Sequence, residues 1–426
     1  MDTQSFMAAL EAAVGRENVR AGAALPPEVV KADWEGKALA TVAPGSAAEV
    51  AGVVRAAEEA GAALIPFGGG TQLHTGYPPR PDRPFLLLPT ARMSRLLDYQ
   101  PDDMTVTCEP GMTLVALDKV LADRRQFLPL DPPLPDKATL GGIVSTNTTG
   151  FWRPAYGSPR DLLIGLRAVL TGGEEVKGGG KVVKNVAGYD VCKLFTGAWG
   201  TLGVLTELTF KVRPLPETER VLAWETPDLV TAATLGLKMH AARLAATYVL
   251  ATNEPEGRPH LALGLQGTAA RVEWQVLQFT RMAVENGISA PVVELTPDQI
   301  RDLRDRQARL APDTSIAGRI ACLPTDLPDL VRALEAQPYC LLTAHCATGT
   351  ISLAATIRVP SLVPKVRAML PPNANLVWTR LDKEIAGSED ADRWGARQEE
   401  FFLQEALKRA LDPKGTFSPG RFLGRI

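Results

Sequence analysis

Cysteine and histidine are scarce in this chain, and neither is spaced as metal sites or disulfide frameworks require. Its 426 residues include five cysteines and four histidines. The number of cysteines is odd and no C-x-x-C pair occurs, which argues against a disulfide framework and against zinc or iron–sulfur ligation. We therefore expect reduced cysteines and no metal site in this chain.

A long apolar run, a basic leader and an excess of charge are also missing. No stretch approaches the ~20 apolar residues that span a bilayer, and residues 1–10 lack the basic start of a signal peptide. The formal net charge of -2 provides no broad positive field for nucleic acid or anionic lipid. These absences predict a cytoplasmic protein with no transmembrane segment and no nucleic-acid partner.

The chain is long enough for two domains. Its 426 residues exceed the size at which a single hydrophobic core usually stops growing. Glycine-rich motifs are concentrated before the proline pair in Arg213–Pro216 and become rare after it. Because a proline pair at such a change in composition indicates a linker, we place a domain boundary at Pro214.

Local patterns predict helices and strands on both sides of this boundary. A helix is expected over 46–61, because Ser46 and Glu49 have capping-box spacing, apolar residues recur on one face and Gly61 ends the pattern. The apolar run 62–67 is too short for a second helix, which favours a buried strand. The other expected strands are 85–88, 104–108, 166–171 and 204–212, and the other expected helices are 269–286, 327–336 and 392–411.

The first glycine element, residues 66–71, has the sequence Pro-Phe-Gly-Gly-Gly-Thr and follows the expected strand directly. Its spacing does not match the G-x-G-x-x-G of Rossmann folds, and Gly178–Lys181 lacks the flanking residues of a P-loop. Backbone N–H groups without side chains can approach a pyrophosphate closely, so we expect a Cβ at Gly69 to take up ligand space. Taken alone, the element is also compatible with a plain turn.

Two further glycine elements follow, at 138–147 and 199–207. Small side chains in the first of them let backbone lie flat against a planar ring or a phosphate, so a Cβ at Gly142 should also displace ligand. The second places two glycines at the start of the strand expected over 204–212. Each is compatible with a structural turn when it is considered by itself.

In this order and at these separations, the three elements resemble the vanillyl-alcohol oxidase or p-cresol methylhydroxylase superfamily of FAD-linked oxidases. The resemblance covers roughly residues 38–214. Residues 415–421 also resemble the closing segment of the family, although Ser418 stands where relatives commonly have Asn. The implied fold is α+β: a p-cresol-methylhydroxylase-type FAD domain of two α/β subdomains (1–214), a cap domain with an antiparallel sheet (215–375), and a segment returning to the FAD domain (376–426).

The resemblance also implies which residues contact the cofactor. The first element would clamp the FAD pyrophosphate, while the second and third would line the flavin and the adenine. His74 does not follow the glycines directly, as the FAD-linked histidine of some relatives does, so we expect noncovalent FAD. The implied FAD-binding residues are Pro66, Phe67, Gly68, Gly69, Gly70, Thr71, Gln72, Pro135, Thr139, Gly141, Gly142, Ser145, Thr146, Asn147, Lys184, Asn185, Gly200, Gly203, Val204 and Arg421.

The resemblance is most specific at residues 184–190. This string, with Leu194 and Gly197 after it, is similar to the E-type FAD-binding subunits of glycolate oxidases rather than to their D-type paralogues. It implies a complex with a catalytic D-type flavoprotein and an iron–sulfur F-type subunit, a small 2-hydroxyacid as substrate, and membrane association only through those partners. We expect the string to border the flavin or its cleft.

The expected cap domain retains only part of a metal-binding motif. Catalytic 2-hydroxyacid dehydrogenases of the superfamily carry H-x-G-D-G-N-x-H there, and its histidines help to bind a divalent metal. In the counterpart, residues 345–352, His345 and Gly349 remain but Ser352 replaces the second histidine. A lone imidazole beside the Cys346 thiol lacks the further ligands that a metal needs, so we expect His345 to be a buried, hydrogen-bonded core residue.

Three functions remain open. The leading hypothesis is the FAD-binding E-type subunit of a glycolate oxidase or dehydrogenase complex, with at most a secondary part in substrate oxidation. A free-standing FAD-dependent 2-hydroxyacid or alcohol dehydrogenase would need a substrate arginine and a base near the flavin, for which Arg319 and Tyr189 are the candidates. A scaffold that has lost its flavin is disfavoured, because glycine loops carry a conformational cost that has no purpose without a ligand.

Overall fold

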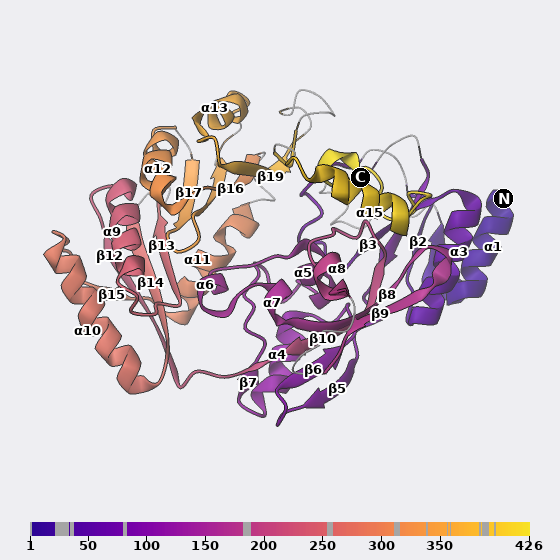
Figure 1. Cartoon of the computed structure of the whole chain (residues 1–426), viewed down its shortest axis with the longest axis horizontal. Helices are drawn as coiled ribbons and strands as arrows, with labels where there is room; N and C mark the ends of the chain where they lie inside the picture. The colour runs from indigo at the N-terminus through magenta and orange to yellow at the C-terminus, as the bar shows by residue number, and fades with distance from the viewer. Residues whose placement is uncertain are drawn as a thin grey trace. The chain divides into compact units, whose positions relative to one another are not determined.

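The structure is a computed structural model of two compact units, each with its own sheets (Figure 1). The first unit comprises Met1–Thr149, Gly157–Leu215 and Arg397–Ile426, and the second comprises Gly150–Tyr156 and Pro216–Ala396. Residues 150–156 therefore belong to the second unit, although both flanking stretches belong to the first. The described residues are 2–21, 34, 38–79, 83–181, 189–253, 259–310 (backbone alone for 306–310), 316–337, 340–355, 357, 359–382, 385, 392–395 and 398–426.

The first sheet of the first unit is mostly parallel and is covered by the helices α1 (Thr3–Val14) and α3 (Ala47–Ala60). The expected start of α3 is confirmed, since the side chain of Ser46 accepts a hydrogen bond from the backbone of Glu49. Its expected end is confirmed as well, because Gly61 adopts φ +69°. In spatial order the strands are β1 (Val19–Ala21), β2 (Ala40–Val42), β4 (Phe85–Pro89) and β3 (Ala63–Phe67).

The second sheet of the first unit is antiparallel. The expected strand at 104–108 begins one residue late, because Met104 has φ +51°. The one at 166–171 runs instead from Leu163 to Val169, since the chain then turns through Gly172 at φ +68°. In spatial order the strands are β5 (Leu96–Gln100), β6 (Thr105–Cys108), β10 (Val204–Lys211), β8 (Leu163–Val169) and β9 (Glu175–Gly179). The helices of this part are α4 (Leu114–Ala122), α5 (Leu140–Thr146), α7 (Pro159–Leu162) and α8 (Val191–Phe195). A separate pair of short strands joins β7 (Gln126–Phe127) to β11 (Arg213–Pro214).

The second unit is built on one antiparallel sheet of eight strands, which confirms the expected architecture for this part of the chain. In spatial order the strands are β15 (Val293–Glu294), β12 (Thr218–Glu225), β14 (His260–Gly267), β13 (Tyr248–Thr252), β17 (Cys340–His345), β18 (Thr350–Ala355), β16 (Ile316–Ala321) and β19 (Asn375–Leu381). The helices are α6 (Arg153–Tyr156), α9 (Leu229–Ala241), α10 (Ala269–Glu285), α11 (Pro297–Leu310), α12 (Leu327–Glu335) and α13 (Leu362–Met369).

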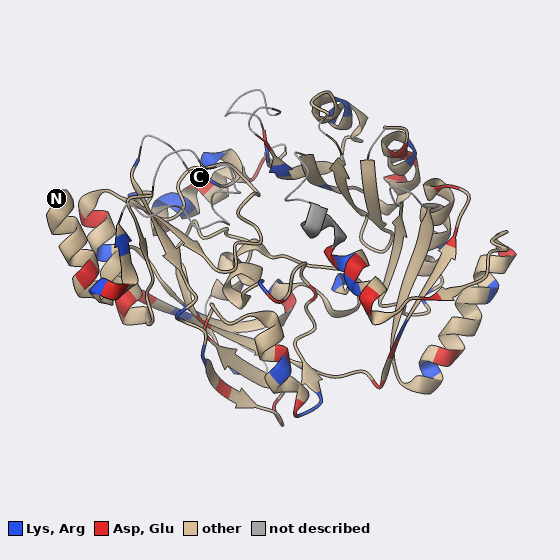
Figure 2. Cartoon of the chain, turned by 180° about the vertical axis from the view of Figure 1, so that it is seen from behind, with Lys and Arg blue, Asp and Glu red and all other residues tan. Residues whose placement is uncertain are grey.

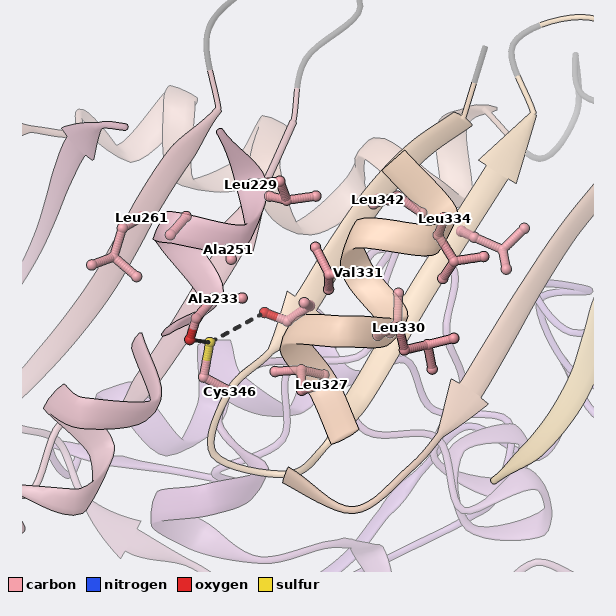
Figure 3. Packing of buried hydrophobic residues seen from close by; sticks show 14 of the residues in the cluster. Leu229, Ala233, Ala251, Leu261, Leu327, Leu330, Val331, Leu334, Leu342 and Cys346 are labelled. Carbon is pink, nitrogen blue, oxygen red and sulfur yellow. Dashed lines mark hydrogen bonds between the residues drawn. The ribbon is translucent and has the colours of Figure 1, made fainter. Parts of the chain in front are cut away.

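Helices α9 and α12 pack against one face of this sheet and form its main apolar core (Figure 3). Leu327, Leu330, Val331 and Leu334 of α12 lie on the buried side of the helix. The thiol of Cys346 lies in the same core, with its Sγ 3.8 Å from the carbonyl oxygen of Ala233. Burial raises the pKa of Cys346 to about 12, so the reactive thiolate form is not populated near neutral pH.

The helix expected over 392–411 is wrong in its first half. Helix α15 spans Phe401–Leu411, whereas the carboxylate of Asp392 accepts hydrogen bonds from the backbone N–H groups of Trp394 and Gly395. Gly395 has φ +84°, which a helix cannot accommodate. Competition from a side chain that hydrogen-bonds to nearby backbone therefore prevents the helix from starting earlier.

Charged residues of both signs are interspersed along both units (Figure 2). Many form local ion pairs, such as Arg92 with Glu49 and Arg167 with Glu175. Within the described parts of the chain, no helix is both long and apolar enough to cross a membrane.

Candidate functional site

A pocket of about 760 Å³, including its open mouth, lies in the first unit, where the three glycine elements meet. Its wall comes from the end of β3 and the loop after it, the loops after β4 and β6, helix α5 with the residue before it, the turn before β10 with the start of that strand, and the C-terminal segment. Its lining residues are Pro66, Phe67, Gly68, Gly69, Gly70, Thr71, Gln72, Leu73, Thr90, Pro110, Thr139, Gly141, Gly142, Ser145, Thr146, Trp199, Gly200, Gly203, Val204, Leu205 and Arg421.

The first glycine element leaves the end of β3 and packs tightly against the second. A Cβ at Gly68 would overlap the side chain of Thr139, and a Cβ at Gly69 would overlap the carbonyl oxygen of Lys137. Gly70 has φ +73°, a conformation that favours glycine. The expectation that a Cβ at Gly69 would enter ligand space is therefore wrong, because protein backbone already fills that space.

The second element is organised around Thr139, which begins α5. Its Oγ1 accepts a hydrogen bond from the backbone of Gly142 at 3.3 Å. A Cβ at Gly142 would lie 3.2 Å from this Oγ1 and within 4 Å of no other neighbouring atom of the described residues, so Gly142 does face open pocket, as expected. Asn147 ends the helix at φ +49°, and its side-chain Oδ1 is buried without a hydrogen-bond partner in the described structure.

The third element turns sharply before β10. The backbone N–H of Trp199 donates to the carbonyl of Ser145 at 2.7 Å, which joins this turn to α5. Trp199 and Gly200 both have positive φ, +55° and +69°. The carbonyl of the next residue, Thr201, accepts a hydrogen bond from the ammonium group of Lys408 on α15 at 2.7 Å. The turn is thus held from one side by the second element and from the other by the C-terminal helix.

The C-terminal segment contributes the positive charge of the pocket. Arg421 is buried, its guanidinium donates to the carbonyls of Leu73 and Tyr77, and it stacks on Trp34 at 4.5 Å. Burial lowers the pKa of Arg421 to about 10, so the group is still a cation near neutral pH. A buried cation beside glycine backbone suits a phosphate group.

Ser418 lies in the same segment and adopts φ +42°. Its backbone N–H donates to the carbonyl of Leu64 on β3 at 2.8 Å, which anchors the segment to the first sheet. Asparagine tolerates this left-handed conformation better than most residues do.

Most of the residues expected to bind FAD line this one pocket. Pro135 and Asn147 lie next to lining segments but not among the lining residues, and Lys184 and Asn185 lie outside the described residues. Tyr189 is 99% exposed and does not line the pocket, and neither does His74. Leu73, Thr90, Pro110, Trp199 and Leu205 line the pocket but were not expected to. Trp199 and Leu205 lie within the third element, whereas Thr90 and Pro110 follow other strands and carry no motif.

The residues of the partial metal motif lie in the second unit. His345 ends β17, partly buried, with its ring centroid 5.2 Å from that of Phe151. Gly349 has φ +63°, and a Cβ there would overlap the carbonyl oxygen of Cys322, so this glycine is explained by a turn. Ser352 lies within β18, paired with Arg319. Among the residues that the structure describes, no group of three or more His, Cys, Asp and Glu side chains is placed to hold a metal.

Burial lowers the pKa of His345 to about 3, and the charges of Arg319 and Arg153 contribute to that shift. The imidazole is therefore neutral at physiological pH. Burial also lowers the pKa of Arg319, and the positive charge of Arg153 makes a second, smaller contribution in the same direction. His345 is thus partly buried with two arginines nearby, and sequence spacing did not indicate Arg153.

Comparison with known proteins identifies an FAD-binding domain that includes most of the residues lining the pocket. Residues 38–179 match the family described as "FAD binding domain". The chain is 41% identical to glycolate oxidase subunit GlcE of Escherichia coli over 122 residues, which are 28% of this chain and 35% of that protein. It is 34% identical to glycolate oxidase subunit GlcD of Bacillus subtilis over 183 residues, 43% of this chain and 38% of that one. The matched parts thus span little more than a third of these relatives.

Solved structures share the fold across both units. p-Cresol methylhydroxylase with substrate bound superposes with a TM-score of 0.74 at 16% sequence identity, covering 98% of this chain and 96% of that one. An alkyldihydroxyacetonephosphate synthase superposes with a TM-score of 0.70 at 17% identity, covering 99% and 86%. The expected α+β fold of the p-cresol methylhydroxylase type is confirmed.

Proposed function

We propose that this chain, an FAD-dependent oxidoreductase related to glycolate oxidase subunits and to D-lactate and D-2-hydroxyglutarate dehydrogenases, is the FAD-binding E-type subunit of a glycolate oxidase or dehydrogenase complex. Its partners would be a D-type catalytic flavoprotein and an F-type iron–sulfur subunit. The carrying observation is the pocket in which the three glycine elements meet Arg421. We further propose a cytoplasmic location, with membrane association only through the partners.

The residues present fit FAD. We assign the pyrophosphate to the backbone of residues 68–71 and to Arg421, because N–H groups free of side chains and a buried guanidinium both stabilise phosphate charge. Gly142, Ser145 and Thr146 would border the ring system. When bound, FAD supplies the redox chemistry of accepting and passing on electrons.

We propose noncovalent binding, because His74 does not line the pocket from which a covalent bond to the cofactor would have to form. The affinity for FAD then comes from Arg421 and from the backbone N–H groups of residues 68–71. Their contribution is electrostatic and requires a closed, well-ordered pocket wall, which the hydrogen bonds of Trp199 and Lys408 maintain.

The partial metal motif supports an accessory role in substrate oxidation. A 2-hydroxyacid loses hydride more readily when a cation polarises its hydroxyl and carboxylate groups. In this chain His345 is neutral, and Ser352 stands at the position of the second histidine of the motif. We propose that the metal site is degenerate in this chain and that the D-type partner carries most of the oxidation.

A free-standing FAD-dependent 2-hydroxyacid dehydrogenase is the second candidate. Arg319 favours it, because a partly buried arginine on the sheet of the second unit is suited to hold a carboxylate. Tyr189 weakens it, since a fully exposed phenol is a poor candidate for a base beside a flavin.

Purification from the native host tests the proposal directly. An affinity-tagged chain should be yellow, should release FAD on denaturation, and should carry a second flavoprotein and an iron–sulfur protein with it. A yellow chain that is isolated alone, and that glycolate reduces, would establish the free-standing dehydrogenase instead. A colourless chain would refute the flavin assignment.

A further inference from the structure

Helix α15 (Figure 1) directs a cation inward and large apolar side chains outward. Its two buried residues are Phe401 and Lys408. Phe402 is 60% exposed, Leu403 is 51% exposed and Leu407 is 39% exposed. A surface helix normally buries its apolar side chains and leaves its charged ones in water, so the arrangement in α15 is largely reversed.

The exposed apolar residues of α15 form one continuous stripe. Phe402, Ala406 and Ala410 are spaced one helical turn apart, and so are Leu403 and Leu407, so their side chains adjoin along the helix. All five are exposed. Single exposed apolar side chains are common on protein surfaces, whereas a contiguous patch of them marks an interaction surface.

The charges that flank the stripe complement each other across a two-fold axis. Glu400 stands at the start of α15 and Arg409 in its last turn; both are exposed, and neither forms an ion pair with a residue that the structure describes. The two lie equally far from the midpoint between residues 404 and 405, as do Phe402 and Leu407. A two-fold axis through this midpoint therefore places Glu400 of one copy against Arg409 of a second copy, and Phe402 against Leu407.

Helix α10 also exposes apolar side chains but does not show this complementarity. Leu277 on α10 is 61% exposed. The charged residues beside it already have partners within the chain: Glu273 lies 3.0 Å from Arg220, and Arg281 lies 2.7 Å from Glu285. Unpaired flanking charges of opposite sign thus distinguish α15 from α10.

We propose that the apolar stripe of α15 is the contact between two copies of this chain, with the two helices antiparallel. The contact removes the stripe from water, and the antiparallel arrangement brings helix ends of opposite partial charge together. Two Glu400–Arg409 pairs, one at each end, fix the register. Because one pair of short helices covers less than the roughly 800 Å² per partner of a standard interface, the dimer forms at micromolar concentrations. This inference goes beyond the proposed flavin function and does not rest on it.

Sedimentation velocity of the flavin-loaded full chain, at about 1 to 100 μM, tests the contact. The wild type should pass from monomer to dimer over this range. Leu403→Gln should raise the dissociation constant at least about tenfold, because Leu403 lies next to the proposed axis. Leu277→Gln on α10 is the matched control, since it removes an equally exposed leucine, and it should leave the dissociation constant unchanged.

A charge swap tests the register. Arg409→Glu and Glu400→Arg should each raise the dissociation constant about fivefold, because each places like charges against one another. The double variant that carries both substitutions should recover most of the affinity, since each copy then presents the same two charges in reverse. Flavin content should stay normal in all of these variants, because the substituted side chains point away from the turn that Lys408 holds.

Three results would overturn the proposal: a wild type that is monomeric throughout, equal effects of Leu277→Gln and Leu403→Gln, or no recovery in the charge-swapped double variant. A monomeric wild type that binds a different flavoprotein, and loses it on Leu403→Gln, would assign the stripe to that partner and overturn the proposal as well. The readout is the mass of the particle, whereas the proposed function is tested by flavin release and reduction by glycolate, so the failure of one is distinguishable from the failure of the other.

Discussion

The ammonium group of Lys408 on α15 lies 2.6 Å from Oδ2 of Asp412, the residue that follows the end of this helix, and both side chains are buried. The same ammonium donates to the carbonyls of Thr201 and Phe417, at 2.7 and 2.8 Å. The Asp412 carboxylate in turn accepts from the backbone N–H groups of Thr416 and Phe417. One ion pair therefore joins the third glycine element to the segment that carries Arg421, although more than 200 residues separate them in sequence.

Replacing Lys408 by Met should destabilise the protein by about 3 kcal/mol, because it leaves the buried Asp412 carboxylate without its cation. FAD content should fall in parallel, since the Thr201 carbonyl would lose the group that holds the turn. Urea unfolding and flavin absorbance measure the two effects. Lys414→Met is the control: Lys414 pairs with Glu58 at 3.2 Å but its side chain is 60% exposed, so its loss should cost less than about 1 kcal/mol. Equal losses of stability and of FAD content in the two variants would contradict the role of Lys408 in holding the third glycine element.

Replacing Gly142 by Ala should lower FAD affinity at least about tenfold while leaving the melting temperature unchanged or raised, because Ala favours α5 and its Cβ faces open pocket. Flavin titration and thermal unfolding give the two values. Gly180→Ala, whose Cβ would meet no atom within 4 Å, should change neither.

Replacing Gly69 by Val should abolish FAD binding and also lower the melting temperature, because the side chain would overlap the Lys137 backbone. Flavin content of the purified variant is the measurement. Normal FAD occupancy together with an unchanged melting temperature would contradict the packing of the first glycine element against the Lys137 backbone.

Replacing Asp118 by Asn should stabilise the protein at alkaline pH but not at acidic pH. Burial raises the pKa of Asp118 to about 7, and the hydrogen bond from Leu128 N opposes that shift. The folded state thus holds a proton that the unfolded state has lost, so the carboxylate costs stability progressively as pH rises from about 4 to about 7. Asn keeps the acceptor for Leu128 and carries no charge, so the gain should be on the order of 1 to 2 kcal/mol at pH 8 and near zero at pH 4.

The difference in melting temperature between Asp118→Asn and the wild type, measured from pH 4 to pH 8, checks this expectation. Asp123→Asn, an exposed position at the end of the same helix, should show no such trend. A difference that does not vary with pH would show that Asp118 titrates normally.

The isolated chain should show little or no bleaching of its flavin by glycolate or lactate, and added zinc, manganese or iron should not change this. His345 is neutral but stands without a second imidazole or a described carboxylate to complete a metal site. Anaerobic absorbance at the flavin band, with each acid and each metal in turn, is the assay. Rapid bleaching by any of these acids would establish the free-standing dehydrogenase in place of the accessory role.

Several helices and strands could be predicted from the sequence, because the interactions that define them are local. Helix α3 follows from Ser46, Glu49 and Gly61, because capping and a glycine stop act within a few residues, and strand β3 follows from the short apolar run after Gly61. The helix expected from 392 failed for an equally local reason, the hydrogen bonds of Asp392 to its own neighbours. That competition depends on the side-chain conformation, which residue periodicity does not contain.

By itself, the sequence determined the three glycine elements and their order, and with them most of the pocket wall and the flavin-type fold. Only the tertiary structure decided that Thr90 and Pro110 complete that wall, that Gly69 is required by the Lys137 backbone, and that Arg153 lies near Arg319 and His345. Sequence patterns report on contacts a few residues apart, where backbone geometry restricts the choices. The remaining contacts join residues far apart in the chain, and close packing of the folded chain alone brings these together.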